Sequence, residues 1–286
     1  MLASILFPLA ESPPSAHAQD YAFWLAKKCS GRVQGLAIID VKSFEIPVLG
    51  TADGLMPSVV SPPVAESRAL LEELTRMARD RADRFARAGA EGGVSCSTAI
   101  RTGIPSDVIA QESIAHDLVI MGRSGYGRAP KSDEAHMDSM VSAVIRSSIR
   151  PVMVAGRPFP ASGAIKSLIV AFDGSVHAAR ALSIAAELGA GFGLECLLVT
   201  IAPAEEVGEE ILAPAAAFLR HHGVSPKKKI MIGSKPSELL CGIASAAGAD
   251  ILIMGAYGHS PIREVLFGCT TERVLNHCDA TVILQS

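Results

Sequence analysis

The chain contains one structural unit twice, and this repeat limits its fold more than any other feature. Residues 105–127 hold a Pro-Ser pair, the run DLVIMG and a Gly-Tyr-Gly sequence, and residues 236–258 hold a Pro-Ser pair, the run DILIMG and a Tyr-Gly sequence. In both copies the Pro-Ser pair is typical of a helix start. The apolar run that follows Asp117 or Asp250 is typical of a buried strand. A chain of 286 residues with this repeat is expected to form two similar units.

Short apolar strands alternate with helices in each half. In the second half the predicted strands are 167–172, 194–201, 227–232, 250–255 and 280–284, and the predicted helices are 175–189, 204–222, 236–247 and 269–277. This alternation favours a parallel sheet with right-handed crossovers. The first half repeats the pattern, with an irregular insertion around residues 44–64. We therefore predict α/β domains at 1–156 and 165–286, joined by a Pro-containing linker at 157–164.

The composition excludes several classes of protein. Apolar residues make up 49% of the chain and charged residues 19%, which is typical of a folded globular protein. The net charge is −3 and no basic stripe is present, so nucleic acid is not an expected partner. The basic run Lys227–Lys229 is interpreted as an exposed strand start. No apolar run is long enough for a membrane helix, so no membrane association is expected.

The cysteines and the N-terminus indicate a cytoplasmic protein. Six cysteines are dispersed without a Cys-x-x-Cys pair, so neither a metal site nor a disulfide framework is predicted. The first 20 residues include an Ala-His-Ala sequence that resembles a signal-peptidase site. However, no Lys or Arg precedes the apolar run, and Pro8 interrupts it. We expect Ser4–Phe7 to be the first strand rather than part of a secretion signal.

A glycine-containing loop in the second copy is the strongest candidate for a binding site. The strand Ile251–Met254 breaks at Gly255, and the loop runs through Gly258 to Gly268, where Cys269–Thr271 begin a helix. The first N–H groups of a helix have no partner within it, and the helix dipole is positive there, so this arrangement suits an anion. An ordinary βα loop also uses Gly and Thr, so the residue types alone leave both interpretations open.

The spacing of these glycines resembles the ATP-binding signature of the universal stress protein family. Two residues separate Gly255 from Gly258, and nine separate Gly258 from Gly268. The sequence departs from the signature at Cys269, where a Ser or Thr is usual, and a thiol is a weaker donor than a hydroxyl. The first-strand run at 170–175 also resembles the family motif. The resemblance covers nearly the whole chain, strongly over 166–286 and weakly over 1–155.

The resemblance implies a fold and a ligand. The fold would be two tandem open parallel sheets of five strands, each in the order 3-2-1-4-5, with helices on both faces. Ligands of such sheets bind outside the C-terminal strand ends where the strand order reverses, and both Asp173 and the glycine loop belong there. Taken by itself, Asp173 is better interpreted as the start of a βα turn with Ser175 as N-cap. The family resemblance instead assigns it to the nucleoside of ATP, which a Mg²⁺ ion could accompany.

The resemblance assigns further residues to the nucleotide. Those expected at the base, the ribose or the phosphates are Ala171, Asp173, Thr200, Met254, Gly255, Gly258, Gly268, Cys269, Thr270 and Thr271. Arg263 lies in the same loop and is interpreted equally well as a phosphate ligand or as an exposed residue. No catalytic residue and no metal ligand is assigned.

The first half differs at the corresponding positions. Ala10 stands in place of Asp173, and Ala135 stands where the last glycine is expected. Asp133, Glu134 and Asp138 would place negative charge where a phosphate would lie. We predict that the first half binds no nucleotide.

The expected function is that of an ATP-binding stress-response regulator rather than an enzyme, because no general base is evident beside the loop. A second hypothesis is an interaction protein that binds no nucleotide and has an unknown protein partner. In the family, last strands pair across a dimer axis, so residues 152–154 are expected to pair with 282–284 inside this chain, and a homodimer is also plausible. An adenylating enzyme is disfavoured, because only Asp-Gly-Ser-Val follows the first strand and the sequence contains no P-loop.

Overall fold

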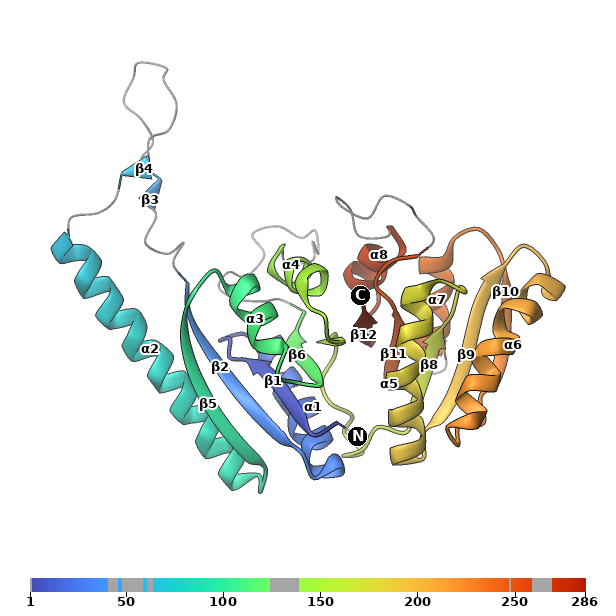
Figure 1. The fold of residues 1–286 in the computed structure, drawn as a ribbon, viewed down its shortest axis with the longest axis horizontal. Coiled ribbons are helices and arrows are strands. Elements are labelled where there is room, and N and C mark those ends of the chain that lie inside the picture. The colour runs from blue at the N-terminus through green and yellow to red at the C-terminus, as the bar shows by residue number, and fades with distance from the viewer. Residues whose placement is uncertain are drawn as a thin grey trace, which may run out of the picture.

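The computed structural model describes residues 2–40, 46–47, 59–60, 64–123, 139–246, 248–258 and 269–286. The first half consists of β1 (Ser4–Pro8), α1 (Pro13–Cys29), β2 (Arg32–Asp40), α2 (Val64–Glu91), β5 (Ser95–Gly103), α3 (Pro105–Ser113), β6 (Leu118–Gly122), α4 (Ser139–Ser147) and β7 (Val152–Ala155). Two short strands of the insertion, β3 (Ile46–Pro47) and β4 (Val59–Val60), pair only with each other and stand away from the main sheet (Figure 1).

The second half contains every element that the sequence predicts for it. These are β8 (Ser167–Ala171), α5 (Val176–Phe192), β9 (Glu195–Ala202), α6 (Glu205–His221), β10 (Lys227–Ile232), α7 (Pro236–Ala246), β11 (Ile251–Gly255), α8 (Cys269–His277) and β12 (Thr281–Gln285). Their bounds differ from the predicted ones by no more than three residues. The N-cap predicted at Ser175 is confirmed, since its side chain accepts a hydrogen bond from the backbone N–H of Ala178 at 3.2 Å.

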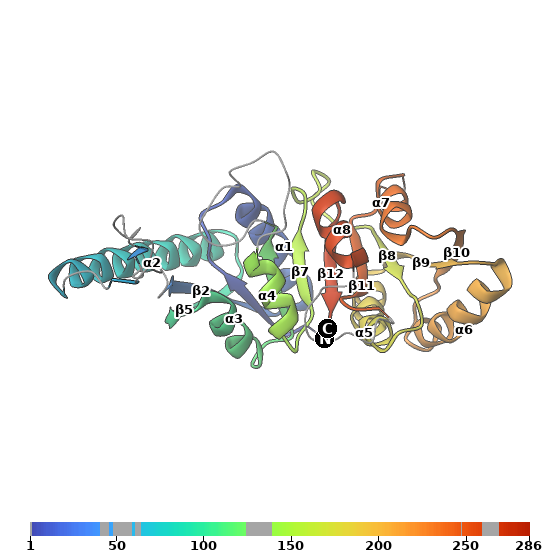
Figure 2. The ribbon, with the colours of Figure 1, turned by 90° about the horizontal axis from the view of Figure 1, so that it is seen from above.

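One continuous sheet joins the two halves (Figures 1 and 2). Its order is β10-β9-β8-β11-β12-β7-β6-β1-β2-β5, so each half has the predicted strand order 3-2-1-4-5. In the main sheet the strands of each half are parallel to one another, whereas β7 and β12 pair antiparallel, with Val154 opposite Val282 and Val152 opposite Leu284. The expected pairing of the two last strands is therefore present, and the two five-stranded sheets form a single ten-stranded one.

Helices cover both faces of this sheet, as predicted. One hydrophobic cluster contains residues of α1, α2, α5 and α6, and the other contains residues of α3, α4, α7 and α8. Successive strand residues belong to alternate clusters: Leu168 and Val170 pack in the first and Ile169 in the second. Each fully buried side chain of this size contributes about 2 kcal/mol. Because both clusters contain residues of both halves, the halves share their cores.

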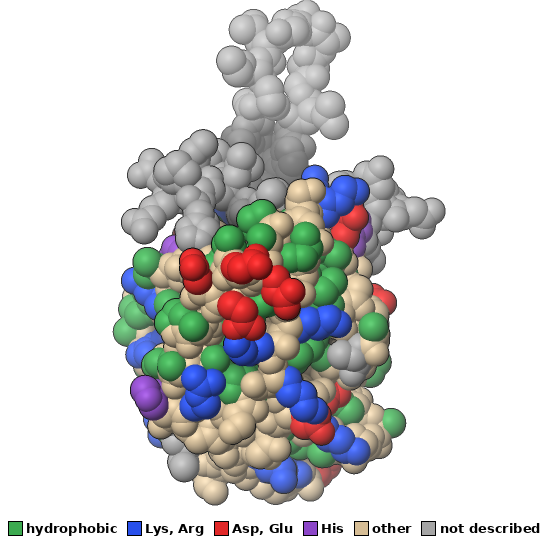
Figure 3. Space-filling model, turned by 90° about the vertical axis from the view of Figure 1, so that its right-hand side faces the viewer, with side chains coloured by type: hydrophobic (Ala, Val, Ile, Leu, Met, Phe, Trp, Pro, Cys, Tyr) green, Lys and Arg blue, Asp and Glu red, His purple; other side chains and the backbone are tan. Residues whose placement is uncertain are grey.

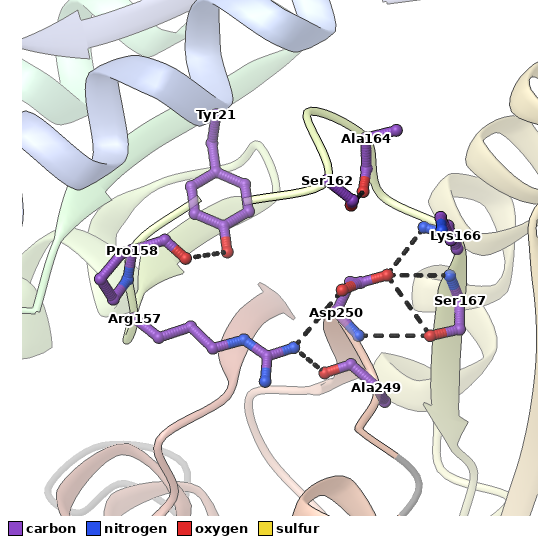
Figure 4. A network of polar contacts seen from close by, with 9 residues as sticks. All are labelled: Tyr21, Arg157, Pro158, Ser162, Ala164, Lys166, Ser167, Ala249 and Asp250. Carbon is purple, nitrogen blue, oxygen red and sulfur yellow. Dashed lines mark hydrogen bonds and ion pairs between the residues drawn. The ribbon is translucent and has the colours of Figure 1, made fainter. Parts of the chain in front are cut away.

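An aspartate before the fourth strand fixes the start of the first strand in each half. Asp250 Oδ2 accepts hydrogen bonds from the backbone N–H groups of Lys166 and Ser167 at 2.7 and 3.1 Å (Figure 4). Asp117 Oδ2 accepts from Ala3 and Ser4 at 2.8 and 3.0 Å. The repeated Asp is therefore explained by this strand connection, at the end of the sheet opposite the candidate site.

Polar contacts also hold the segment between the halves. Arg157 donates to the carbonyl of Ala249 and lies 3.7 Å from Asp250, while the Tyr21 hydroxyl on α1 donates to the carbonyl of Pro158 at 3.5 Å (Figure 4). These bonds attach residues 157–158 to both halves. The described part of the linking segment is thus fixed in place between them.

Basic and acidic side chains are interspersed with other residues on the outer side of the second half (Figure 3). Lys227, Lys228 and Lys229 begin the edge strand β10 and are exposed, which confirms the interpretation of the basic run. Lys227 pairs with Glu195 at 3.4 Å, and Lys228 pairs with Glu209 of α6. Lysines on an edge strand oppose pairing with another sheet. Among the described helices, none has both the length and the apolar character needed to cross a membrane.

Candidate functional site

The candidate site lies at the C-terminal ends of β8 and β11, where the strand order reverses. Asp173 follows β8, is exposed, and accepts a hydrogen bond from the backbone N–H of Ser175 through Oδ1 at 2.9 Å. Its Oδ2 faces Gly258 of the loop after β11, because a Cβ added to Gly258 would lie 3.2 Å from that oxygen. Two predicted site residues that are 85 positions apart therefore lie together.

Gly255 has a packing role that the sequence did not reveal. A Cβ at this position would lie 2.7 Å from the backbone nitrogen of Ala178 and 2.9 Å from the carbonyl carbon of His177, so α5 could not approach β11 so closely. Gly122 has the same relation to α1, with distances of 2.5 Å to Pro14 C and 2.7 Å to Ser15 N. The first half keeps Gly122 and Gly125 but has Ala135 in place of the last glycine of the signature. The contact of Gly122 with α1 gives this glycine a structural reason that is independent of any ligand.

The start of α8 is tied to the loop after β11 through Thr271. This residue is buried, and its hydroxyl donates to the carbonyl of Ala256 at 2.9 Å. A hydroxyl has one hydrogen to donate, so in this arrangement Thr271 anchors the helix and does not supply a donor for a phosphate. Thr270 is half-buried at the same helix end. Arg263, Gly268 and the side chain of Cys269 lie outside the described residues.

Ala171 and Thr200, both assigned to the base pocket, lie on opposite faces of the sheet. Ala171 is opposite Val199 in the register and packs in the same cluster, so Thr200, one residue further, faces the other side. Met254 lies on the face of Ala171. Thr200 is buried, and its hydroxyl has no hydrogen-bond partner among the described residues. The structure thus brings Met254 and Ala171 to one wall and leaves Thr200 apart from them.

Two aromatic residues that the sequence did not assign also lie at this edge. The rings of His177, in the first turn of α5, and Tyr257, beside Gly258, are 5.2 Å apart and meet edge to face at 63°. Burial raises the pKa of the Tyr257 hydroxyl, and the nearby positive charge of Arg146 on α4 opposes this effect. Both copies of the repeat contain a Tyr in the loop after the fourth strand, so the sequence could have indicated Tyr257 as a site residue. No sequence pattern indicates His177, because its position at the site depends on how α5 packs against β11.

The first half can be compared only in part. Ala10 follows β1 where Asp173 follows β8, as the repeat predicts. The acidic residues Asp133, Glu134 and Asp138, and Ala135 with them, lie outside the described residues, so the absence of a nucleotide there stays a prediction. Within the described part of the chain, no group of three or more His, Cys, Asp or Glu side chains is placed to hold a metal ion.

The repeated fold defines a tandem protein of the open α/β class. Its candidate ligand site lies at the C-terminal ends of β8 and β11, which is a topological switch point. The model of the universal stress protein family matches residues 1–156 and again residues 164–284. The chain therefore belongs to the universal stress protein family, as a tandem member.

Individual relatives agree with this assignment. A universal stress protein of Synechocystis sp. is 24% identical over 274 residues, which cover 92% of each chain. The crystal structure of a universal stress protein from Archaeoglobus fulgidus superposes with a TM-score of 0.75 at 19% identity, covering 99% of this chain and 96% of that one. A putative universal stress protein from Pseudomonas aeruginosa gives 0.63 at 18% identity, covering 99% and 93%. These structural matches show the shared fold.

Proposed function

We propose that the second half binds an adenine nucleotide, ATP in the first place, and that the protein acts as a stress-response regulator. The observation that carries the proposal is the convergence of Asp173 and Gly258 at the switch point. The Asp173 carboxylate can accept hydrogen bonds from an adenine amino group or a ribose hydroxyl. Because Gly258 has no side chain, the space beside that carboxylate stays open to a ligand.

The described residues fit the nucleoside part of such a ligand better than its phosphates. Ala171 and Met254 give a small apolar wall on one face, and the N-terminal end of α8 offers partial positive charge to an anion. The Thr271 hydroxyl is used by Ala256. Phosphate binding would therefore depend on Thr270, on backbone N–H groups, and on the loop outside the described residues. A Mg²⁺ ion would accompany the phosphates rather than bind a protein site of its own.

We expect little or no hydrolysis of the bound nucleotide. The family resemblance places Asp173 at the nucleoside end, so this carboxylate would lie away from the terminal phosphate. Its Oδ1 also accepts the N–H of Ser175. A general base must come within hydrogen-bond reach of the attacking water, and Asp173 does not meet this condition in the proposed orientation.

The experiment is to denature the purified full-length protein and to identify released nucleotide by chromatography. One ATP per chain is expected, and Asp173→Ala and Gly258→Val should lose it. Gly242→Ala is the matched control, because a Cβ at this position of α7 would meet no described atom within 4 Å. Two nucleotides per chain would show that the first half also has a working site.

The alternative is an interaction protein of the same fold that binds no nucleotide. If no nucleotide is released and calorimetry detects no binding of added ATP with Mg²⁺, the proposal is wrong and this alternative replaces it. The departure at Cys269 would then be the first position to test, by Cys269→Ser.

A further inference from the structure

A cavity of about 360 Å³ opens between α1 and α2 in the first half. The buried residues Phe7, Leu9 and Phe85 form its apolar floor, and the rings of Phe7 and Phe85 lie 5.6 Å apart. Polar residues of both helices and of the loop after β1 stand around this floor: Glu11, Ser12, Ser15, Gln19, Arg81 and Arg84. The volume falls within the range of small-molecule pockets, about 300–1,000 Å³.

The second half has no equivalent set of polar residues at this place. Gly93 after α2 and Gly223 after α6 both have a left-handed φ, and the N–H groups of Val94 and Val224 each bond the carbonyl five residues earlier. This shared helix end aligns α2 with α6 at an offset of 130 positions. Arg81 then corresponds to Ile211, Arg84 to Pro214 and Ala88 to Phe218.

The packing of the corresponding helices also differs between the two halves. Ile211 and Phe218 pack on the core of the second half, and α6 contacts α5 directly. Among the described residues, α2 does not approach α1 as closely as α6 approaches α5, and the cavity lies between α1 and α2. On α1, Gln19 lines the cavity, whereas Leu182, at the same position of α5, is buried in the core. The first half therefore has an open space lined by charged side chains where the second half has packed apolar side chains.

The charges around the cavity favour a monoanion. Arg84 forms an ion pair with Glu11, in which the side chains are 58% and 51% exposed. Exposed pairs contribute little to stability and open easily. Arg81, a second guanidinium group, lines the same cavity. Guanidinium groups match carboxylates in geometry, and Glu11 already shows that a carboxylate reaches Arg84.

We propose that this cavity binds a small organic monocarboxylate with an apolar body, such as an aromatic or branched aliphatic acid. The apolar body would rest on Phe7, Leu9 and Phe85, and the carboxylate would replace Glu11 at Arg84, with Arg81 adding positive charge. A phosphate dianion fits less well, because Glu11 would repel its second charge. The cavity is lined by α1 and α2 of the first half, so the proposal is independent of nucleotide binding at Asp173.

The test uses the full-length protein with phenylacetate and isovalerate as probes and phenylacetamide as the uncharged control. Binding is measured by ligand-observed NMR and calorimetry. Both acids should bind, and the amide should bind at least about tenfold more weakly. Arg84→Gln should weaken the acids at least about tenfold. Glu11→Gln should strengthen them, because it removes the competing carboxylate.

Two further variants separate the cavity from general surface charge and from folding. Arg87→Gln is the matched control, since Arg87 is exposed on the same helix and does not line the cavity. Ala88→Phe introduces the residue that the second half has at this position and should abolish binding by filling the space, while the protein keeps its circular dichroism spectrum. Asp173→Ala should leave binding of the acids unchanged, and ATP should not compete with them.

Several results would overturn the proposal. They are no detectable binding of either acid at millimolar concentration, equal binding of the amide, equal effects of Arg84→Gln and Arg87→Gln, or weaker binding after Glu11→Gln. Competition by ATP would instead assign the acids to the nucleotide site.

Discussion

The two halves have the same supporting residues but different residues at their ligand edges. The shared positions are a capping serine, a glycine at the end of the fourth strand and an aspartate before it, namely Ser12 and Ser175, Gly122 and Gly255, and Asp117 and Asp250. At the ligand edge Ala10 stands in place of Asp173, and at the start of the last helix Val141 stands in place of the anchoring Thr271. The comparison therefore separates residues that the fold requires from residues that a ligand requires, within one motif.

The strongest test of this comparison concerns the paired glycines. Gly122→Ala and Gly255→Ala would each place a Cβ less than 3 Å from backbone atoms of a neighbouring helix. We expect each to lower the free energy of unfolding by about 3 kcal/mol, because backbone cannot move aside as a side chain can. Urea denaturation measures this, with Gly242→Ala as the neutral control. A large effect at Gly255 with none at Gly122 would mean that packing does not explain the glycine.

The second prediction exchanges the residues that follow the first strands. Asp173→Ala should weaken ATP binding by about 2 kcal/mol, the value of hydrogen bonds to a charged group. Ala10→Asp should not create a second site, because the acidic residues at 133–138 would still repel phosphate. Calorimetric stoichiometry decides between the outcomes. A second nucleotide bound by Ala10→Asp would show that one residue, rather than the whole loop, separates the halves.

The sequence predicted the scaffold better than the site. Alternating apolar runs and helix signals located the elements of the second half, and the family resemblance supplied the strand order and the pairing of β7 with β12. The separation of Thr200 from Ala171 depends on the register of β8 against β9, which no local pattern specifies. The ring contact of His177 with Tyr257 and the cavity beside Arg84 likewise require the positions of whole helices.

The third prediction concerns Thr271→Val, which introduces the residue that the first half has at the corresponding position, Val141. Thr271→Val has nearly the same shape but leaves the carbonyl of Ala256 without its hydroxyl donor. The expected loss is about 1 kcal/mol of unfolding free energy. Thr270→Val, at a half-buried neighbour, is the control. Equal stability of Thr271→Val and the wild type would show that this hydroxyl does not anchor α8.

The smallest effect concerns a titratable residue that differs between the halves. His116 is buried, and its Nδ1 lies 2.7 Å from the hydroxyl of Ser4; Ala249 occupies the same position in the second half. Burial lowers the pKa of His116 below its usual value of 6.5, and the positive charge of Arg32 adds to this effect, while Glu112 and Asp117 oppose it. The folded protein therefore favours the neutral imidazole.

The direction of the pH dependence follows from this shift. Above about pH 6.5 His116 is neutral in both the folded and the unfolded states, so its full contribution to stability is present. As the pH falls below that value, the unfolded chain binds a proton more readily than the folded one, and the free energy of unfolding decreases. His116→Ala, which copies Ala249, should make the unfolding free energy depend less steeply on pH between 7 and 5. The slope is the quantity to compare, because losing the Ser4 contact lowers stability equally at every pH. An unchanged slope would mean that His116 does not distinguish the halves in this way.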